Sequence, residues 1–559
     1  VIRAFHCLAN GTVTGLGTLR GHQTDLLERA RPYVILLAQI AMLLLLIKMA
    51  RTFDERSVVG VAFPLLLVAI MVRYRPAAAD AALVRLLQLI GVISGAYALI
   101  HYPLFPVVHQ GVRATVVLVA LGGLWVAAVA CGALCLRWPV LAVVSASYLV
   151  WSKKAVVWVT GLWHGHVIDV GPLAEVSFCI LAGLLVARLF EHVRDRLSWS
   201  TPVAADIGVA SALFSQAVIA AAISIHLGNY YSSFLAKVTL DGGPLSWLLH
   251  NDPGKLFLVA LDDNHILFSG WDWLVDAVKL ILQHTSAVTN AFILIGQGLA
   301  LVGILMPRRW LLILLLAFDI MHLSIVAILG ANFAPWIFLN LAIAAVVVSR
   351  TYRRPPLLIG LLSVLFILTD SRFMSQAWLG WYDTLANNKM YFEAVDKNGT
   401  RHYVPTNFFT FYSYPFAHMA YGSPDAATAF AVDNPNGGTQ VFRKVLASMT
   451  CDVPVLTARD DASQDKAKDG INVPAFDAYI RGYHNLVSKV FDRPGAFPSA
   501  VYPHHFFIPM QYGTSFNAVK MSDIVAYIYR RESVCLSVQD GVPVRRIVSE
   551  AEHRIAVTP

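Results

Sequence analysis

The sequence predicts a polytopic α-helical membrane bundle of about eleven spans, followed by a C-terminal α+β domain outside the membrane. Hydrophobic residues make up 57% of the chain and charged residues only 14%, whereas soluble domains average about 45–50% and about 25%. The apolar residues are also gathered into runs of the length that crosses a bilayer. A soluble fold could not bury this much apolar surface, so a chain of soluble domains is excluded.

The apolar runs fall into two groups, in residues 1–204 and in residues 205–370. The first group lies at Val34–Met49, Val58–Val72, Leu83–Ile100, Thr115–Leu136, Val140–Thr160 and Pro172–Phe190. The second group lies at Ile207–Leu227, Val288–Met306, Trp310–Leu329, Asn332–Ser349 and Leu357–Thr369. Each run is predicted to be a transmembrane helix.

Basic residues predict the orientation of the bundle, because Lys and Arg gather at the cytoplasmic ends of spans. Most of them follow even-numbered runs: Arg73, Arg75, Arg188, Arg194, Arg196, Arg308, Arg309, Arg350, Arg353 and Arg354. This pattern predicts a multi-pass protein of the cell inner membrane with a cytoplasmic N-terminus and a periplasmic or extracellular C-terminal domain. The residues on the opposite side of this scheme are Lys48, Arg51, Arg56, Lys153 and Lys154.

The formal net charge of +8 does not indicate a nucleic-acid partner. The basic residues stand singly or in short clusters beside apolar runs, whereas a nucleic-acid-binding surface needs a dense basic patch. The expected partner is therefore the lipid bilayer.

A polar segment at residues 228–285 separates two of the runs and is predicted to be interfacial or re-entrant. It is too polar to span a bilayer, yet it contains aromatic residues such as Trp271. From Trp273 onward, apolar residues recur at helical spacing while Asp276 and Lys279 fall between them. This pattern is typical of a helix at the membrane surface, and an ordinary amphipathic loop helix is the alternative.

Residues 371–559 are predicted to form the extracytoplasmic domain. The sequence Asp-Lys-Asn-Gly at 396–399 lies between Met390–Val395 and Arg401–Val404, which predicts a hairpin with an Asn-Gly turn. Ser522–Arg531 predicts a helix or strand that ends at its two arginines.

Cysteine placement predicts one disulfide. Cys451 and Cys535 are the two cysteines of the outer domain, and an exported compartment is oxidising, so we expect them to be paired. The sequence contains no CxxC zinc signature, and no metal site is predicted.

Ionisable residues within a bilayer are costly and mark candidate functional sites. Lys237 lies at the outer end of the run that begins at Ile207, and a lysine withdrawn from water can act as a base. The alternative is that Lys237 only extends its ammonium group to the interface. Asp319 and His322 lie three residues apart on one helix face, so we expect both to face the interior of the bundle.

Two segments resemble a known family. The stretches NYYSSFLAKVTLDGGPLSWLL (229–249) and LLILLLAFDIMHLSIVAILGANFAPWIFLNLA (311–342) resemble the membrane core of the vitamin K-dependent gamma-carboxylase and its bacterial relatives, the HTTM proteins. The matching positions are Tyr230, Tyr231, Lys237, Trp247, His322 and Trp336. The resemblance covers about residues 207–349, roughly a quarter of the chain, and the carboxylase has paired lysines where this chain has Ala236-Lys237.

The resemblance implies a quinone-linked membrane enzyme. Lys237 would deprotonate a reduced quinone that reacts with oxygen, and the strong base so formed would abstract a proton from a substrate. His322, beside Asp319, would orient or stabilise an oxyanion. Tyr230, Tyr231 and Trp247 would line the cofactor site.

Two other functions compete with this interpretation. The chain could be a non-catalytic accessory or scaffolding subunit of a larger membrane complex, with the outer domain contacting partner chains. Its aromatic runs at 408–412 and 502–507 fit a contact surface or a small core equally. A transporter is disfavoured, because the sequence lacks paired broken helices.

Overall fold

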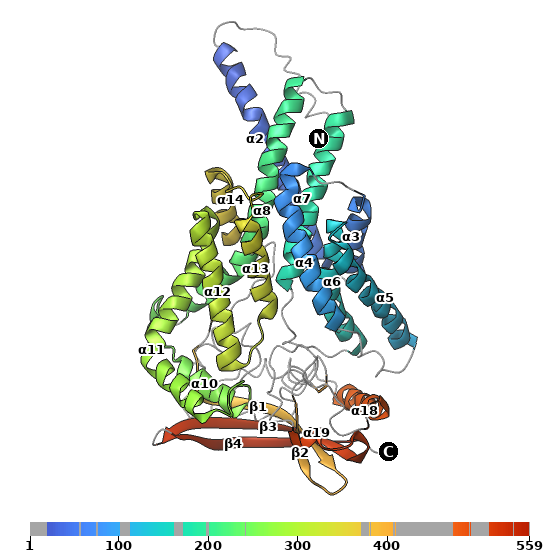
Figure 1. The fold of residues 1–559 in the computed structure, drawn as a ribbon, viewed down its shortest axis with the longest axis vertical. Coiled ribbons are helices and arrows are strands. Elements are labelled where there is room, and N and C mark those ends of the chain that lie inside the picture. The colour runs from blue at the N-terminus through green and yellow to red at the C-terminus, as the bar shows by residue number, and fades with distance from the viewer. Residues whose placement is uncertain are drawn as a thin grey trace, which may run out of the picture.

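The computed structural model describes residues 20–54, 57–73, 77–100, 112–160, 171–196, 201–240, 242–369, 379–380, 382–405, 408–409, 473–490, 492, 514–539 and 542–557. A long helical body ends at a four-stranded antiparallel sheet (Figure 1). The prediction of a helical bundle followed by an α+β region is confirmed at this level.

Six of the described helices are long and apolar enough to cross a membrane. They are α2 (Arg20–Asp54), α4 (Ala81–Ile100), α7 (Gly171–Arg196), α8 (Thr201–Val238), α11 (Asp272–Leu299) and α12 (Arg308–Leu329). Shorter apolar stretches of 10–17 residues occur in α3 (Ser57–Met71), α5 (Val112–Leu134), α6 (Ala142–Thr160), α13 (Ala334–Val348) and α14 (Leu357–Leu368). Each predicted run thus contains a helix, but the count of eleven spans is not confirmed.

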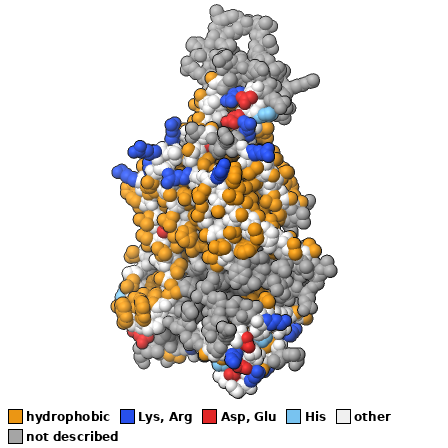
Figure 2. Space-filling view, turned by 45° about the vertical axis from the view of Figure 1, so that its right-hand side comes forward, with side chains coloured by type: hydrophobic (Ala, Val, Ile, Leu, Met, Phe, Trp, Pro, Cys, Tyr) orange, Lys and Arg blue, Asp and Glu red, His pale blue; other side chains and the backbone are white. Residues whose placement is uncertain are grey.

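The surface of the helical body is largely apolar. Large hydrophobic side chains such as Val119, Val288 and Leu357 are each 70% exposed, and Figure 2 shows apolar side chains covering a broad band of the molecule. Apolar patches of this extent are rare on soluble proteins. The band indicates a membrane protein.

The predicted interfacial segment 228–285 shares both of its ends with long helices. Its first residues continue α8 as far as Val238, and its last residues form the start of α11. Two short helices, α9 (Ser246–His250) and α10 (Pro253–Asp262), lie between them. The amphipathic stretch from Trp273 is therefore the beginning of a long helix, and Trp273 itself is highly exposed.

The outer sheet has the strand order β2-β1-β3-β4. The strands are β1 (Ala386–Asp396), β2 (Arg401–Val404), β3 (Ile524–Gln539) and β4 (Val542–Ala556), with helices α18 (Val473–Val490) and α19 (Thr514–Asn517) beside them. Short 3₁₀ helices are η1 (Ala78–Asp80), η3 (Pro139–Leu141), η4 (Ala300–Leu305) and η9 (Met521–Asp523).

The predicted hairpin between β1 and β2 is confirmed. In its turn, the Asp396 carboxylate accepts hydrogen bonds from the backbone N–H groups of Asn398 and Thr400, both at 2.8 Å. Gly399 has a φ of 81°, a conformation that favours glycine. The predicted end of the Ser522–Arg531 element is wrong, because β3 continues through both arginines to Gln539.

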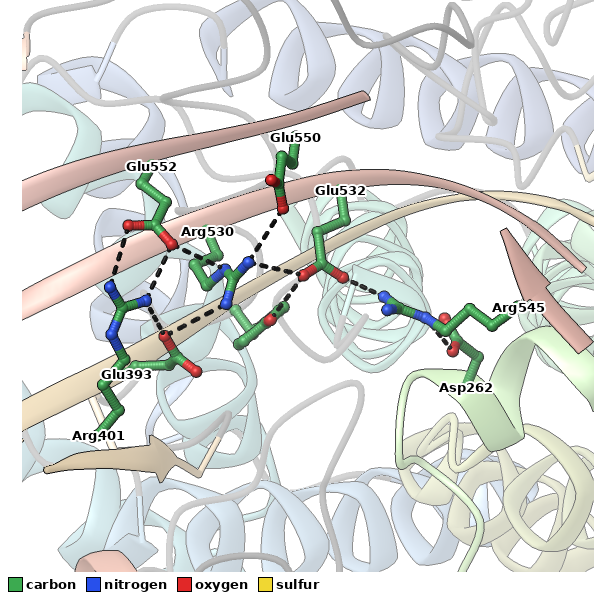
Figure 3. Close-up of polar contacts among 9 residues, drawn as sticks. Asp262, Glu393, Arg401, Arg530, Glu532, Arg545, Glu550 and Glu552 are labelled. Carbon is green, nitrogen blue, oxygen red and sulfur yellow. Dashed lines mark hydrogen bonds and ion pairs between the residues drawn. The ribbon is translucent and has the colours of Figure 1, made fainter. Parts of the chain in front are cut away.

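Charged side chains on one face of the sheet form a network that reaches the helical body (Figure 3). Glu532 is its most buried member, with a side chain only 3% exposed, and it pairs with Arg530 and Arg545. Arg545 also binds the Asp262 carboxylate at the end of α10, at 2.8 Å. Burial opposes ionisation of Glu532, but the hydrogen bond from Arg545 and its other polar contacts outweigh this effect and lower the pKa of Glu532.

Apolar contacts accompany this network. Leu258 of α10 packs against Val534 and Leu536 of β3. The sheet is therefore joined to the helical body by both charged and apolar contacts.

Cys535 of β3 is disulfide-bonded, whereas Cys131, Cys135 and Cys179 are free. Cys451 lies outside the described residues. The predicted pairing of Cys451 with Cys535 therefore stays a prediction.

Candidate functional site

Three helices bring polar and aromatic side chains together in the core of the bundle. Each contributes two residues four positions apart, a spacing that places them on one helix face. The pairs are His226 and Tyr230 of α8, Phe318 and His322 of α12, and Trp336 and Asn340 of α13. All six side chains are buried, and so is Asp319 beside Phe318. We call these seven residues the core cluster.

Asn340 organises the hydrogen bonds of the core cluster. Its Nδ2 donates to Asp319 Oδ1 at 2.7 Å and to the Tyr230 hydroxyl at 3.0 Å. Its Oδ1 lies 2.7 Å from His226 Nε2. Since both Nδ2 hydrogens are used, Oδ1 must accept, and Nε2 of His226 is therefore the donor.

Aromatic rings enclose this amide. Tyr230 stacks on Phe318, with ring centroids 3.6 Å apart and planes within 4°. The centroid of the Trp336 ring lies 5.4 Å from the ring centroids of both His226 and Tyr230 and 5.8 Å from that of His322. Through these contacts, α8 and α12 meet at this point.

Three buried nitrogen atoms of the core cluster have no hydrogen-bond partner among the described residues. They are His226 Nδ1, His322 Nδ1 and Trp336 Nε1. Trp336 Nε1 can only donate, and Nδ1 of a neutral His226 that donates through Nε2 can only accept. A buried unpaired polar group costs about 1–3 kcal/mol, so these atoms are suited to a ligand that both accepts and donates hydrogen bonds.

Lys237 lies in a second group of residues at the end of α8 nearer the sheet. Its side chain is only 7% exposed. Its Nζ donates to the backbone carbonyls of Leu379 at 2.6 Å and Ser233 at 3.3 Å, and it lies 5.1 Å from the centre of the Trp247 ring. Lys237 is thus held inside the protein, and the alternative that it only reaches out to the interface is not what the geometry shows.

The chain that leads from the helical body to β1 covers this end of α8. Gly380 lies so close to Ala236 that a Cβ would overlap the Ala236 backbone. Asp383, which attracts Lys237 electrostatically, accepts a hydrogen bond from Asn251 Nδ2 at 2.9 Å. Asn290 in turn donates to the Asn251 carbonyl at 2.8 Å. These bonds fix the carboxylate beside the lysine.

A buried polar stripe along α8 joins the two groups. His226, Tyr230, Ser233 and Lys237 recur at helical spacing on one face, and all four are buried. Lys237 follows Tyr230 by seven positions, a rise of about 10 Å along the helix. Among the described residues, Lys237 makes no direct contact with His322, so the stripe is the connection that the fold provides.

The residues predicted from the sequence therefore fall in different places. Tyr230, Asp319 and His322 belong to the core cluster, whereas Trp247 lies against Lys237. Tyr231 stacks on Phe234, with ring centroids 5.7 Å apart.

His226, Asn340 and Asp383 were not among the predicted site residues. An asparagine four residues after Trp336 and a histidine four residues before Tyr230 are polar residues within apolar runs, which was the available signal. Nothing in the sequence pointed to Asp383, because its position depends on the return of the chain over α8.

No family model, curated protein or solved structure matches this chain.

Proposed function

We propose that this chain is a membrane enzyme that uses a reduced quinone, with Lys237 as the base and the core cluster as the binding site for the quinone ring. The observation that carries the proposal is the set of unpaired nitrogens on His226, His322 and Trp336. Buried polar groups are normally paired, and ionisable residues inside a membrane protein are a functional signal.

The core cluster fits a reduced quinone in chemical type. A hydroxyl group both donates and accepts, so it can satisfy His226 Nδ1 as well as Trp336 Nε1. The aromatic faces of Trp336 and Phe333 offer a stacking surface, with Phe333 stacked on His322 at 5.2 Å. A bound reduced quinone would supply the electrons for a reaction with oxygen.

Lys237, Asp383 and His322 take different roles in the proposed reaction. Lys237 lies about 10 Å along α8 from the core cluster, so the proton would reach its Nζ by relay along the buried stripe through Tyr230 and Ser233. Asp383 stabilises the ammonium that results. His322 donates or accepts at Nδ1 to hold an oxygen atom of the ligand. The surrounding helices exclude water, which protects a strong base from being quenched.

Oxygen uptake tests this proposal. Detergent-solubilised protein is mixed with menadiol or duroquinol, and oxygen consumption above the uncatalysed rate is recorded. We expect Lys237→Ala to reduce it by about a hundredfold or more and His322→Ala to weaken it. The matched control is Lys397→Ala, which removes an exposed lysine that pairs with Asp523 in the sheet region.

The accessory-subunit function is the competing outcome. If Lys237→Ala and His322→Ala consume oxygen as the native protein does, the enzyme proposal fails. Stoichiometric partner chains that are retained on purification and lost in these variants would then establish the subunit role.

A further inference from the structure

Five arginines lie at the end of the helical body away from the sheet. Arg308 and Arg309 begin α12, and Arg350, Arg353 and Arg354 lie between α13 and α14. All five are exposed, and Figure 2 shows Lys and Arg side chains gathered along this edge of the apolar band. We call them the arginine patch.

The two arginine-bearing segments are held against each other. Arg308 donates to the Ser349 carbonyl at 3.2 Å, and Arg354 donates to the Leu305 carbonyl. Tyr352 is half-buried, and its hydroxyl interacts electrostatically with both Arg354 and Arg308. The patch is therefore a fixed surface formed by the start of α12 and the loop between α13 and α14.

Among the described residues, the arginine patch has no acidic partner. Residues 306–310 and 349–356 contain neither Asp nor Glu, and within the described part of the chain none of the five arginines is in an ion pair. By contrast, Arg188 and Arg194 of α7 pair with Glu191 and Asp195. A cluster of unpaired guanidinium groups is suited to phosphate, which it can bind through two parallel hydrogen bonds.

Apolar side chains continue directly from the patch into the apolar band. Trp310, Leu357, Leu358 and Leu361 are each at least 50% exposed. A ligand at this position thus meets cationic groups at one end and an apolar surface at the other. Free phosphate would use only the first of these, whereas a phospholipid uses both.

We propose that the arginine patch binds the headgroup phosphate of an anionic phospholipid whose acyl chains lie along the exposed faces of α12 and α14. This site is distinct from the core cluster and does not depend on the proposed enzyme activity. The lipid would bridge the start of α12 and the loop between α13 and α14, and so fix the end of α12, the helix that carries Asp319 and His322.

Native mass spectrometry tests the site. The full-length protein is titrated with phosphatidylglycerol in mild detergent, and the lipid-bound fraction is measured. The variant Arg350→Gln/Arg353→Gln removes two arginines that make no hydrogen bond to other described residues. Since an arginine near an anionic surface strengthens binding about fivefold, we expect about 25-fold weaker binding.

The matched control is Arg188→Gln/Arg194→Gln, which removes two arginines that already have acidic partners. We expect it to bind phosphatidylglycerol like the native protein. Equal loss in both variants, or no loss in the first, would overturn the proposal. Competition by glycerol phosphate as effective as competition by the lipid would also overturn it.

A second measurement covers the case in which the variant does not fold. A photoreactive phosphatidylglycerol is reconstituted with the native protein in phosphatidylcholine liposomes, and the labelled peptides are identified. Labelling should concentrate on residues 306–310 and 349–361. Labelling spread evenly around the apolar band contradicts a specific site.

Discussion

Replacing Asn340 by leucine should destabilise the bundle strongly. The substitution keeps a side chain of similar size but removes the amide that binds His226, Tyr230 and Asp319. Hydrogen bonds between membrane helices contribute about 0.6–2 kcal/mol each. Three of them give about 2–6 kcal/mol if they are additive, and the upper half of this range is favoured because Asp319 is left buried without its donor.

The assay is the free energy of unfolding, measured by titrating the detergent-solubilised protein with a denaturing detergent. The control is Ser324→Ala, which removes an exposed hydroxyl bonded only to its own helix. A second comparison is Asn340→Leu/Asp319→Asn, which should recover part of the loss because the unpaired carboxylate is gone. If Asn340→Leu is as stable as the control, Asn340 does not organise the core cluster.

Three further predictions concern other parts of the molecule. The pKa of Glu532 is lowered below its usual 4.5, so its ion pairs stabilise the sheet above that pH and are lost as the pH falls through the lowered pKa. In Glu532→Gln, the free energy of unfolding should therefore fall less on acidification than in the native protein, and an identical pH profile would contradict this role of Glu532. Gly330→Ala should lower the thermal midpoint more than Gly399→Ala, because both have positive φ but only at Gly330 would a Cβ overlap the His265 carbonyl; equal midpoints would contradict the close approach. Intact mass with and without reductant should show one disulfide that is lost in Cys451→Ser, whereas a disulfide that persists in this variant would contradict the pairing of Cys451 with Cys535.

Much of the fold could be predicted from the sequence because its signals are local. Runs of about spanning length identify helices from composition alone, and the Asn-Gly turn after Asp396 specifies a hairpin from two residues. The end of β3 was misplaced at Arg530 and Arg531, because charged residues in a strand are ambiguous until their partners are known. Those partners, among them Glu552 for Arg530, lie on a neighbouring strand.

The site was predictable only in part, for the same reason. The spacing of Asp319 and His322 placed both on one helix face, and both are buried as expected. The separate position of Lys237 was not predictable from spacing, since it depends on how α8 packs and on the path of the chain after α14. Asn340 escaped notice because a single amide in an apolar run has no distinctive spacing.

Photoaffinity labelling with an azido-quinone tests the central claim most directly. The native protein is irradiated with the reduced probe in detergent, with and without excess menadiol, and the labelled peptides are mapped. The proposed site predicts menadiol-sensitive labelling of α8, α12 and α13 around Tyr230, His322 and Trp336, and its loss in the folded variant Trp336→Ala. Labelling that is confined to exposed apolar faces such as that of α5, and that menadiol does not reduce, would contradict a quinone site in the core cluster.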